Sequence, residues 1–283
     1  LHGRTAAERS AMGECPKDRG GYFIINGNEK ALISQERPVE NRIACFAETD
    51  TSKPYVARVE VKSTIDQRFF PIKPTLIRLT KQQTGVTRNE KQNVGHRMVI
   101  FIPNGRQPIP LFILYKALGV TTDREIFSFL LTENDDEEYK NFLIPSAREA
   151  HAVFSQEDAI RYISNSINIR LDPDVFKEMT NADSEEELLK KKIEYRMKYT
   201  KDLLDRDFLP HTGQNVRKKL FFMSLMVRKL IEAYRTDVYT DRDKLTEKRL
   251  DLPGTLMLKI FRHWLNNTLE EVKQQMIRVL KNT

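Results

Sequence analysis

The chain has 283 residues, of which 40% are hydrophobic and 31% are charged, which provides enough apolar material for a core and excludes a disordered chain. Its 11 glycines and 12 prolines exclude a collagen-like or low-complexity protein. The formal net charge of +7 permits a polyanionic partner without requiring one, and the length suggests about two domains or one large one.

The start of the chain and its two cysteines bear on processing and location. The sequence begins at Leu1 without an initiator Met, so we expect a piece of a longer polypeptide. No apolar run near the start predicts a secretory signal, and no stretch of about 18 uncharged apolar residues predicts a membrane span. Cys15 and Cys45 form no zinc-binding pattern. We expect no structural zinc and a reducing compartment, with a single disulfide as the alternative.

The charge is unevenly distributed along the chain. Residues 54–124 carry a net +8, residues 125–187 carry −11 and residues 188–236 carry +8, whereas 1–48 and 237–283 carry 0 and +2. Such blocks can be solvated faces of ordinary structure. Alternatively, they indicate a basic surface toward nucleic acid and an acidic one toward solvent or a protein partner.

The first third of the chain is typical of β-structure. Asn26 and Gly27 separate the apolar runs 22–25 and 31–33, and an Asn-Gly pair in this position predicts a hairpin because both residues tolerate positive φ. We expect further strands at 55–61, 76–79 and 98–102. We expect the polar stretch 81–96 to be a long loop between paired strands.

From about residue 109 the hydrophobic period becomes helical. Gly119 stands where a C-terminal cap belongs, and Ser155 and Ser184 each begin a capping-box pattern. Pro253 can be the first residue of a long final helix, since its missing N–H costs nothing there. The expected helices therefore cover 111–118 and 126–130, follow Ser155 and Ser184, cover 217–235, and run from Pro253 toward the end. The fold class expected is α+β.

No catalytic motif is present in the sequence. It contains no phosphate-binding loop, no dinucleotide-binding fingerprint and no nucleophile elbow. The acidic run 133–138 lacks calcium-loop spacing and is interpreted as a solvated loop or an acidic helix start. The lysine triplet 190–192 and the basic triplet 217–219 could touch phosphates, but solvated helix faces are the expected alternative. The histidines lie far apart and are interpreted as surface or packed residues: His2, His96, His151, His211 and His263.

Two short stretches are richer in polar and glycine residues than their structure requires. The first reads GGYFIINGNEK at 20–30 and is followed by SQER at 34–37. The second reads DRD at 241–243 and is followed by KRLDLPG at 248–254. The structural alternatives are a β-hairpin for the first and, for the second, a charged loop that caps the last helix.

These stretches resemble two landmarks of the second-largest subunit of multisubunit DNA-directed RNA polymerase. PLFILYKALG at 110–119, DREI at 123–126 and FLPH at 208–211 resemble segments between the landmarks, in the same order. The sequences of these motifs are closer to those of the eukaryotic, archaeal and large-DNA-virus enzymes than to those of the bacterial enzyme. The resemblance covers nearly the whole chain, and LPG at 252–254 departs from the LAG of many relatives.

The resemblance implies an architecture and a function. Residues 1–48 and 237–283 would be two pieces of the protrusion, and 49–236 would be the lobe inserted between them. Together they would form one side of the DNA cleft of an RNA-synthesising enzyme, while the fragment itself would carry no catalytic residue. Magnesium and zinc would be bound elsewhere in the complex, so this part is expected to hold no cofactor.

The resemblance also implies partners and a location. The partners would be the largest subunit and other polymerase subunits, DNA and the RNA–DNA hybrid, and initiation factors on the lobe, with no membrane. The location would be the nucleus of a eukaryotic cell, or the cytoplasm or virion for a large DNA virus.

Residue roles are carried over only where the motifs match. The resemblance implies no catalytic and no metal-binding residue here, and a nucleic-acid-binding set that consists of Lys30, Gln35, Arg37, Asp243, Lys248 and Arg249. Lysine and arginine neutralise phosphates, and an aspartate can accept a hydrogen bond from a base amino group. The alternatives are a non-catalytic nucleic-acid-binding or assembly module, and an interaction domain whose basic patches bind acidic proteins.

Overall fold

The computed structural model describes residues 3–50, 52–65, 71–81, 83–87, 90–132, 137–169 and 185–282. Two compact units are present. One is formed by Leu1–Val39 together with Asp243–Thr283, and the other is Glu40–Arg242. The middle unit thus interrupts the chain of the first unit. No helix among the described residues is long and apolar enough to cross a membrane.

The middle unit is built on an antiparallel sheet. Its strands follow the order β10-β9-β6-β5-β4, with β4 at Ala44–Ala47, β5 at Tyr55–Ser63, β6 at Lys73–Thr80, β9 at Met98–Phe101 and β10 at Ile109–Pro110. Along β5, the side chains of Ala57, Val59 and Val61 are buried and those between them are half-buried. The sheet therefore turns one face to the core, as the alternating sequence predicts.

The boundaries of the middle unit differ from those that the resemblance implied. The unit begins at Glu40 rather than at 49 and ends at Arg242 rather than at 236. Strand β4 lies within it because it pairs with β5. Beyond β4, Thr240 hydrogen-bonds both backbone groups of Cys45, at 3.0 Å to the amide and 2.8 Å to the carbonyl. These bonds complete the sheet edge.

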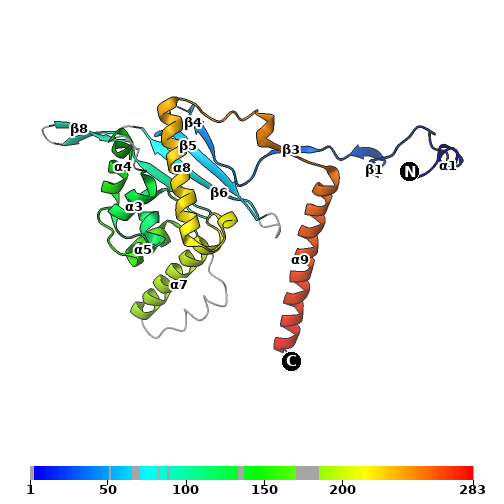
Figure 1. Cartoon of the computed structure of the whole chain (residues 1–283). Coiled ribbons are helices and arrows are strands. Elements are labelled where there is room, and N and C mark those ends of the chain that lie inside the picture. The colour runs from blue at the N-terminus through cyan, green and yellow to red at the C-terminus, as the bar shows by residue number, and fades with distance from the viewer. Residues whose placement is uncertain are drawn as a thin grey trace. The chain divides into compact units, whose positions relative to one another are not determined.

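Helices pack on the sheet and on one another. The bounds are Leu111–Ala117 for α2, Asp123–Leu130 for α3, Glu137–Glu149 for α4, Gln156–Ser166 for α5, Glu185–Arg206 for α7 and Val216–Thr236 for α8. Helix α8 lies across β4, β5 and β6 (Figure 1). Every residue of α2 is buried, which explains its nearly continuous apolar sequence. Gly119 follows α2 with φ +100°, as expected for a residue that ends a helix.

The expected loop at 81–96 is wrong. Gln83–Thr87 forms β7 and Glu90–Gly95 forms β8, and the two strands pair as an antiparallel hairpin. These strands are rich in polar residues and therefore carry little of the hydrophobic alternation that reveals a half-buried strand. Of the acidic run 133–138, the residues 133–136 lie outside the described part, and α4 begins at Glu137.

The triplet 217–219 is not a uniformly solvated helix face, because Lys219 is fully buried. Its Nζ donates to the carbonyls of Leu204 at 2.6 Å and Asp205 at 2.7 Å, in the last turn of α7. A lysine at a helix C-terminus interacts favourably with the helix dipole and pairs otherwise unbonded carbonyls. Burial nevertheless lowers the pKa of Lys219 to about 8. Its role is to close α7, which excludes contact with a phosphate.

The other unit is made of short elements and one long helix. Its elements are α1 at Ala6–Ala11, β1 at Tyr22–Ile25, β2 at Asn28–Ala31, β3 at Gln35–Pro38, β11 at Lys248–Asp251 and α9 at Pro253–Asn282. Strands β1 and β2 form the expected hairpin, and Asn26 and Gly27 both have positive φ, at 51° and 76°. Helix α9 begins at Pro253, as predicted. No described side chain of α9 is buried.

Both cysteines are free thiols, so the disulfide alternative is wrong: Cys15 is exposed and Cys45 is buried. Burial raises the pKa of the Cys45 thiol to about 11, which keeps it protonated near neutral pH.

Candidate nucleic-acid interface

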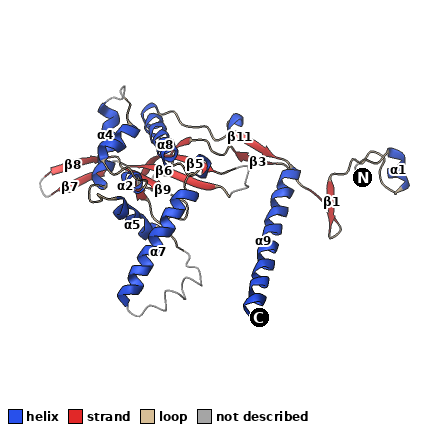
Figure 2. Ribbon diagram, turned by 60° about the horizontal axis from the view of Figure 1, so that its bottom comes forward, coloured by secondary structure: helices blue, strands red, loops and turns tan. Residues whose placement is uncertain are grey.

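The six predicted site residues all lie in the unit formed by the two ends of the chain, and two strands of that unit carry four of them. Strand β3 pairs antiparallel with β11 (Figure 2), and the register places Arg37 opposite Arg249 and Gln35 opposite Asp251. The first landmark of the resemblance is therefore hydrogen-bonded to the second. We call this pair of strands the β3–β11 ribbon.

Strand alternation sorts the side chains of the ribbon into two sets. Gln35, Arg37, Arg249 and Asp251 share one face because directly opposed residues point the same way and successive residues alternate. The other face carries Glu36, Pro38, Lys248 and Leu250. Of the predicted residues, Gln35, Arg37 and Arg249 thus share one face, and Lys248 lies on the other.

Asp251 is the centre of the first face. Its Oδ1 accepts from Arg37 Nε at 2.9 Å and its Oδ2 accepts from Lys259 Nζ at 2.7 Å. These bonds, first from Lys259 and then from Arg37, hold the pKa of the Asp251 carboxyl below its usual value. Arg37 is therefore engaged in joining β3 to β11. In the sequence, Asp251 stood only within the charged stretch before the last helix, and no local pattern revealed its bond to Arg37.

On the opposite face, Lys248 lies between two carboxylates. Its Nζ forms an ion pair with Glu36 and lies 3.8 Å from Asp243 Oδ1. The Asp243 side chain is 96% exposed, whereas that of Lys248 is 20% exposed. The structure therefore brings Asp243 and Lys248 together, with Asp243 accessible and Lys248 largely covered.

The remaining predicted residues are exposed. Arg249 donates from Nη1 to the carbonyl of its neighbour Lys248 at 2.9 Å, and Gln35 lies beyond it on the same face of the ribbon. Lys30 lies on β2 opposite Phe23, in a hairpin whose side chains are almost all exposed. Exposed lysine and arginine side chains can donate to phosphate oxygens without breaking an internal ion pair.

A hydrogen bond fixes the start of the β1–β2 hairpin. The Tyr22 hydroxyl donates to Asp18 Oδ2 at 2.6 Å, and Asp18 Oδ1 accepts from the Gly20 amide at 2.7 Å. The bond from Tyr22 is the main cause that lowers the pKa of Asp18, and it raises the pKa of Tyr22 to about 12. At neutral pH Asp18 stays ionised and Tyr22 stays protonated. The hydrogen bond between them therefore persists and holds the loop before the hairpin.

The chemistry available at this interface is recognition. Among the described residues, no group of three or more His, Cys, Asp or Glu side chains could hold a metal ion. The polar groups of the ribbon and the hairpin are cations, the amides of Asn26, Asn28 and Gln35, the Tyr22 hydroxyl, and carboxylates of which Glu36 and Asp251 pair with cations. Such a set can bind phosphates and base edges.

The geometry can be compared with known proteins. The model of the family RNA polymerase Rpb2, domain 2, matches residues 39–251. The DNA-directed RNA polymerase II subunit RPB2 of Schizosaccharomyces pombe is 29% identical and aligns with 98% of this chain and 21% of its own length. The corresponding subunit of Encephalitozoon cuniculi is 30% identical, over 100% of this chain and 22% of its own length.

An archaeal protein is similar over the same extent. The DNA-directed RNA polymerase subunit Rpo2N of Methanocaldococcus jannaschii is 32% identical and aligns with 98% of this chain and 49% of its own length. The chain therefore spans about a fifth of the length of the two RNA polymerase II relatives and about half of the archaeal one.

Proposed function

The chain belongs to the RNA polymerase Rpb2 domain 2 family, and from this membership we propose that it forms the lobe and part of the protrusion of a second-largest polymerase subunit. The middle unit, Glu40–Arg242, corresponds to the lobe, and the unit of the two chain ends corresponds to the protrusion. Together they provide one side of the DNA cleft and support template-directed RNA synthesis.

The observation that carries the proposal is the β3–β11 ribbon. Its two strands contain the two stretches that resemble the landmarks of this subunit, and Arg37 and Asp251 join them across 214 positions of sequence. A ladder between these stretches places the polar residues of both at one location. A chance resemblance of two short motifs gives no reason for them to pair.

The exposed residues of this location are assigned to direct nucleic-acid contact. Lys30 and Arg249 neutralise phosphates, and Gln35 donates or accepts beside them. Asp243 is accessible to a base amino group. Arg37 and Lys248 are engaged in ion pairs with Asp251 and Glu36, so they hold the strands that present the other four.

The proposal places the chemistry of synthesis outside this chain. The catalytic magnesium and the zinc of the complex are held elsewhere in the assembly, and this part binds and positions nucleic acid. Its partners are the largest and other polymerase subunits, the RNA–DNA hybrid and initiation factors on the lobe. In a eukaryotic cell the site of action is the nucleus, and for a large DNA virus it is the cytoplasm or virion.

Affinity purification of the tagged full-length protein tests the proposal. We expect the largest subunit to co-purify in stoichiometric amount, together with RNA synthesis that requires a DNA template and nucleoside triphosphates. Duplex DNA binding that weakens steeply with salt, without a largest subunit or synthesis, would indicate the non-catalytic nucleic-acid-binding module. Duplex DNA binding that does not change with salt concentration would indicate the protein-interaction domain.

A further inference from the structure

A second interaction surface lies on the sheet of the middle unit, around Arg78. The Arg78 guanidinium carbon lies 4.7 Å from the ring centroid of Tyr55 and 4.9 Å from that of Phe101. The two rings approach each other edge-on, with centroids 6.4 Å apart. We call these three residues the Arg78 site. An arginine held by two aromatic rings has a fixed orientation and needs little further ordering to bind a ligand.

A β-bulge builds this arrangement. Tyr55 pairs with Thr80 and Ala57 with Leu79, so the register shifts by one residue between Tyr55 and Ala57. Regular alternation would place Tyr55 on the same face as Ala57, which is buried. The bulge instead turns Tyr55 to the face of Arg78, opposite the face that packs on the core. Bulges that redirect a side chain are found preferentially next to functional sites.

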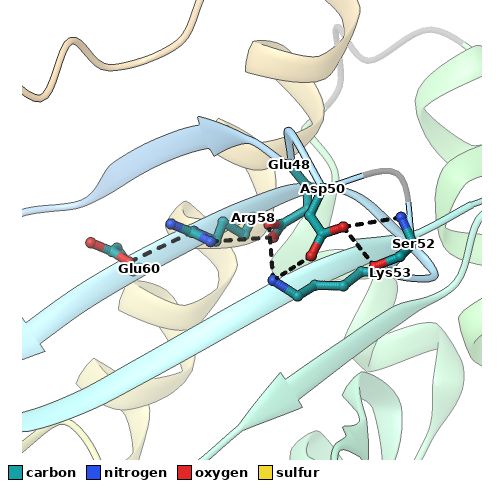
Figure 3. A network of polar contacts seen from close by, with 6 residues as sticks. All are labelled: Glu48, Asp50, Ser52, Lys53, Arg58 and Glu60. Carbon is teal, nitrogen blue, oxygen red and sulfur yellow. Dashed lines mark hydrogen bonds and ion pairs between the residues drawn. The ribbon is translucent and has the colours of Figure 1, made fainter.

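Arg78 differs from the arginine directly opposite it in the register, Arg58. Arg58 Nη1 donates to Glu48 Oε2 at 3.2 Å, and Arg58 Nε lies 3.9 Å from Glu60 Oε2 (Figure 3). Lys53 also pairs with carboxylates of this network, including Asp50 at 3.1 Å. The charge of Arg58 is therefore compensated inside the molecule.

The charge of Arg78 has no such compensation. Within the described residues it makes no ion pair, and its Nε atom is buried without a hydrogen-bond partner. The rings of Tyr55 and Phe101 lie over its guanidinium, and because Nε is buried, the in-plane N–H groups of Nη1 and Nη2 are the ones left for a ligand. A guanidinium presents these donors in a fork that matches the two oxygens of a carboxylate. Leu76, opposite Phe101 and half-buried, adds apolar surface beside them.

We propose that the Arg78 site docks an acidic segment of a partner protein, with one carboxylate bound by Arg78 and an adjacent apolar side chain on Phe101 and Leu76. A nucleic-acid backbone fits less well, because a run of phosphates needs several cations in a row. The neighbouring cations Arg58 and Lys53 are already paired with Glu48, Asp50 and Glu60, so they are not available to further phosphates. The surface lies in the middle unit and is independent of the β3–β11 ribbon.

Fluorescence anisotropy with the full chain tests the proposal. The probe is a labelled synthetic peptide that repeats Glu-Leu-Glu-Phe, and the control peptide replaces each Glu with Gln. We expect saturable binding of the acidic peptide, loss of binding for the Gln peptide, and an affinity lower by about tenfold or more for Arg78→Gln. Arg78→Lys keeps the charge but loses the fork, so we expect an intermediate loss.

Arg217→Gln is the matched control, because Arg217 is an exposed arginine 5.8 Å from the ring of Phe221 on α8. We expect it to bind the peptide like the unmodified chain. The proposal fails if the acidic peptide does not bind, if the Gln peptide binds equally, or if Arg217→Gln weakens binding as much as the Arg78 variants. It also fails if both Arg78 variants, folded by circular dichroism, keep full affinity, or if duplex DNA is the ligand whose affinity depends on Arg78.

Discussion

Arg37 and Asp251 lie 214 positions apart in the sequence and are joined by a bond of 2.9 Å from the Arg37 Nε to the Asp251 Oδ1. The Asp251 side chain is 9% exposed and also accepts from Lys259 on α9. One carboxylate therefore connects the two strands of the ribbon to the long helix that follows. The ribbon has only two strands, and such a ladder is marginal without side-chain support.

Replacement of Asp251 is expected to loosen the ribbon. Asp251→Asn removes the carboxylate that accepts from Arg37 and Lys259, and the loss of these charged hydrogen bonds costs about 1–3 kcal/mol. We expect the backbone amides of β3 and β11 to exchange with deuterium about tenfold faster, measured by mass spectrometry on the intact chain. Glu271→Gln, an exposed position on α9, is the control and should leave this exchange unchanged. Unchanged protection in Asp251→Asn would refute the role assigned to Asp251.

Lys30→Ala and Arg249→Ala are expected to weaken retention of the transcript by the assembled enzyme while folding stays intact. Both side chains are exposed and carry a charge that a phosphate can use. Each variant should lower the slope of affinity against salt concentration by about one. The measurement is the half-life of stalled elongation complexes at several salt concentrations.

Lys244→Ala is the matched control for these two variants, since Lys244 is exposed in the same unit but lies outside the two stretches at 241–243 and 248–254 that carry the resemblance. We expect it to have no effect on transcript retention. If Lys30→Ala or Arg249→Ala unfolds at a lower temperature than Lys244→Ala, the residue concerned has a structural role instead.

The buried Lys219 predicts a pH dependence of stability. Its pKa is about 8 in the folded chain, below the ordinary value of 10.5, so the unfolded state binds more protons between these values. The contribution of Lys219 to stability therefore rises as the pH increases from 8 to 10.5. Urea unfolding should show the difference between the unmodified chain and Lys219→Met increasing over this interval. If the free energies of unfolding of the two proteins followed parallel curves against pH, the lowered pKa of Lys219 would be contradicted. Cys45 titrates in the same region but is present in both proteins, so its effect cancels in the difference.

His211 predicts a loss of folding stability at acidic pH. Its Nδ1 lies 2.7 Å from the buried Ser63 hydroxyl, its ring meets Phe222 edge-on, and burial lowers its pKa below the ordinary 6.5. The stability from neutral His211 is full above pH 6.5 and is lost as the pH falls through the folded pKa. His211→Gln should remove this loss, measured by thermal unfolding at a series of pH values, whereas exposed His263→Gln should retain it. An acid profile unchanged by His211→Gln would exclude this residue as the cause.

Short-range patterns in the sequence determined much of the secondary structure. Alternation predicted the core of β5, and the helical period predicted α2 and α8, because each pattern repeats within a few residues. Asn26 and Gly27 predicted the hairpin turn, since its backbone angles are a local property. Strands β7 and β8 were missed because they are polar and carry no hydrophobic period.

The candidate nucleic-acid interface, too, was predictable from the sequence only in part. The resemblance of two motifs was sufficient to name Lys30, Gln35 and Arg249, which the structure places on exposed strands. It was insufficient to show that Arg37 is held by Asp251 or that Lys248 pairs with Glu36. Both ion pairs depend on the strand register, which a single motif does not encode.

The sequence by itself thus determined the elements, the hairpin and the family resemblance. Only the tertiary structure decided that β3 pairs with β11, that Lys219 closes α7 and that Tyr55 turns toward Arg78. The physical reason is the separation in sequence over which each effect acts. Backbone propensity and hydrophobic period act between neighbours, whereas strand pairing, burial of a charge and a bulge depend on residues that meet only when distant segments pack together.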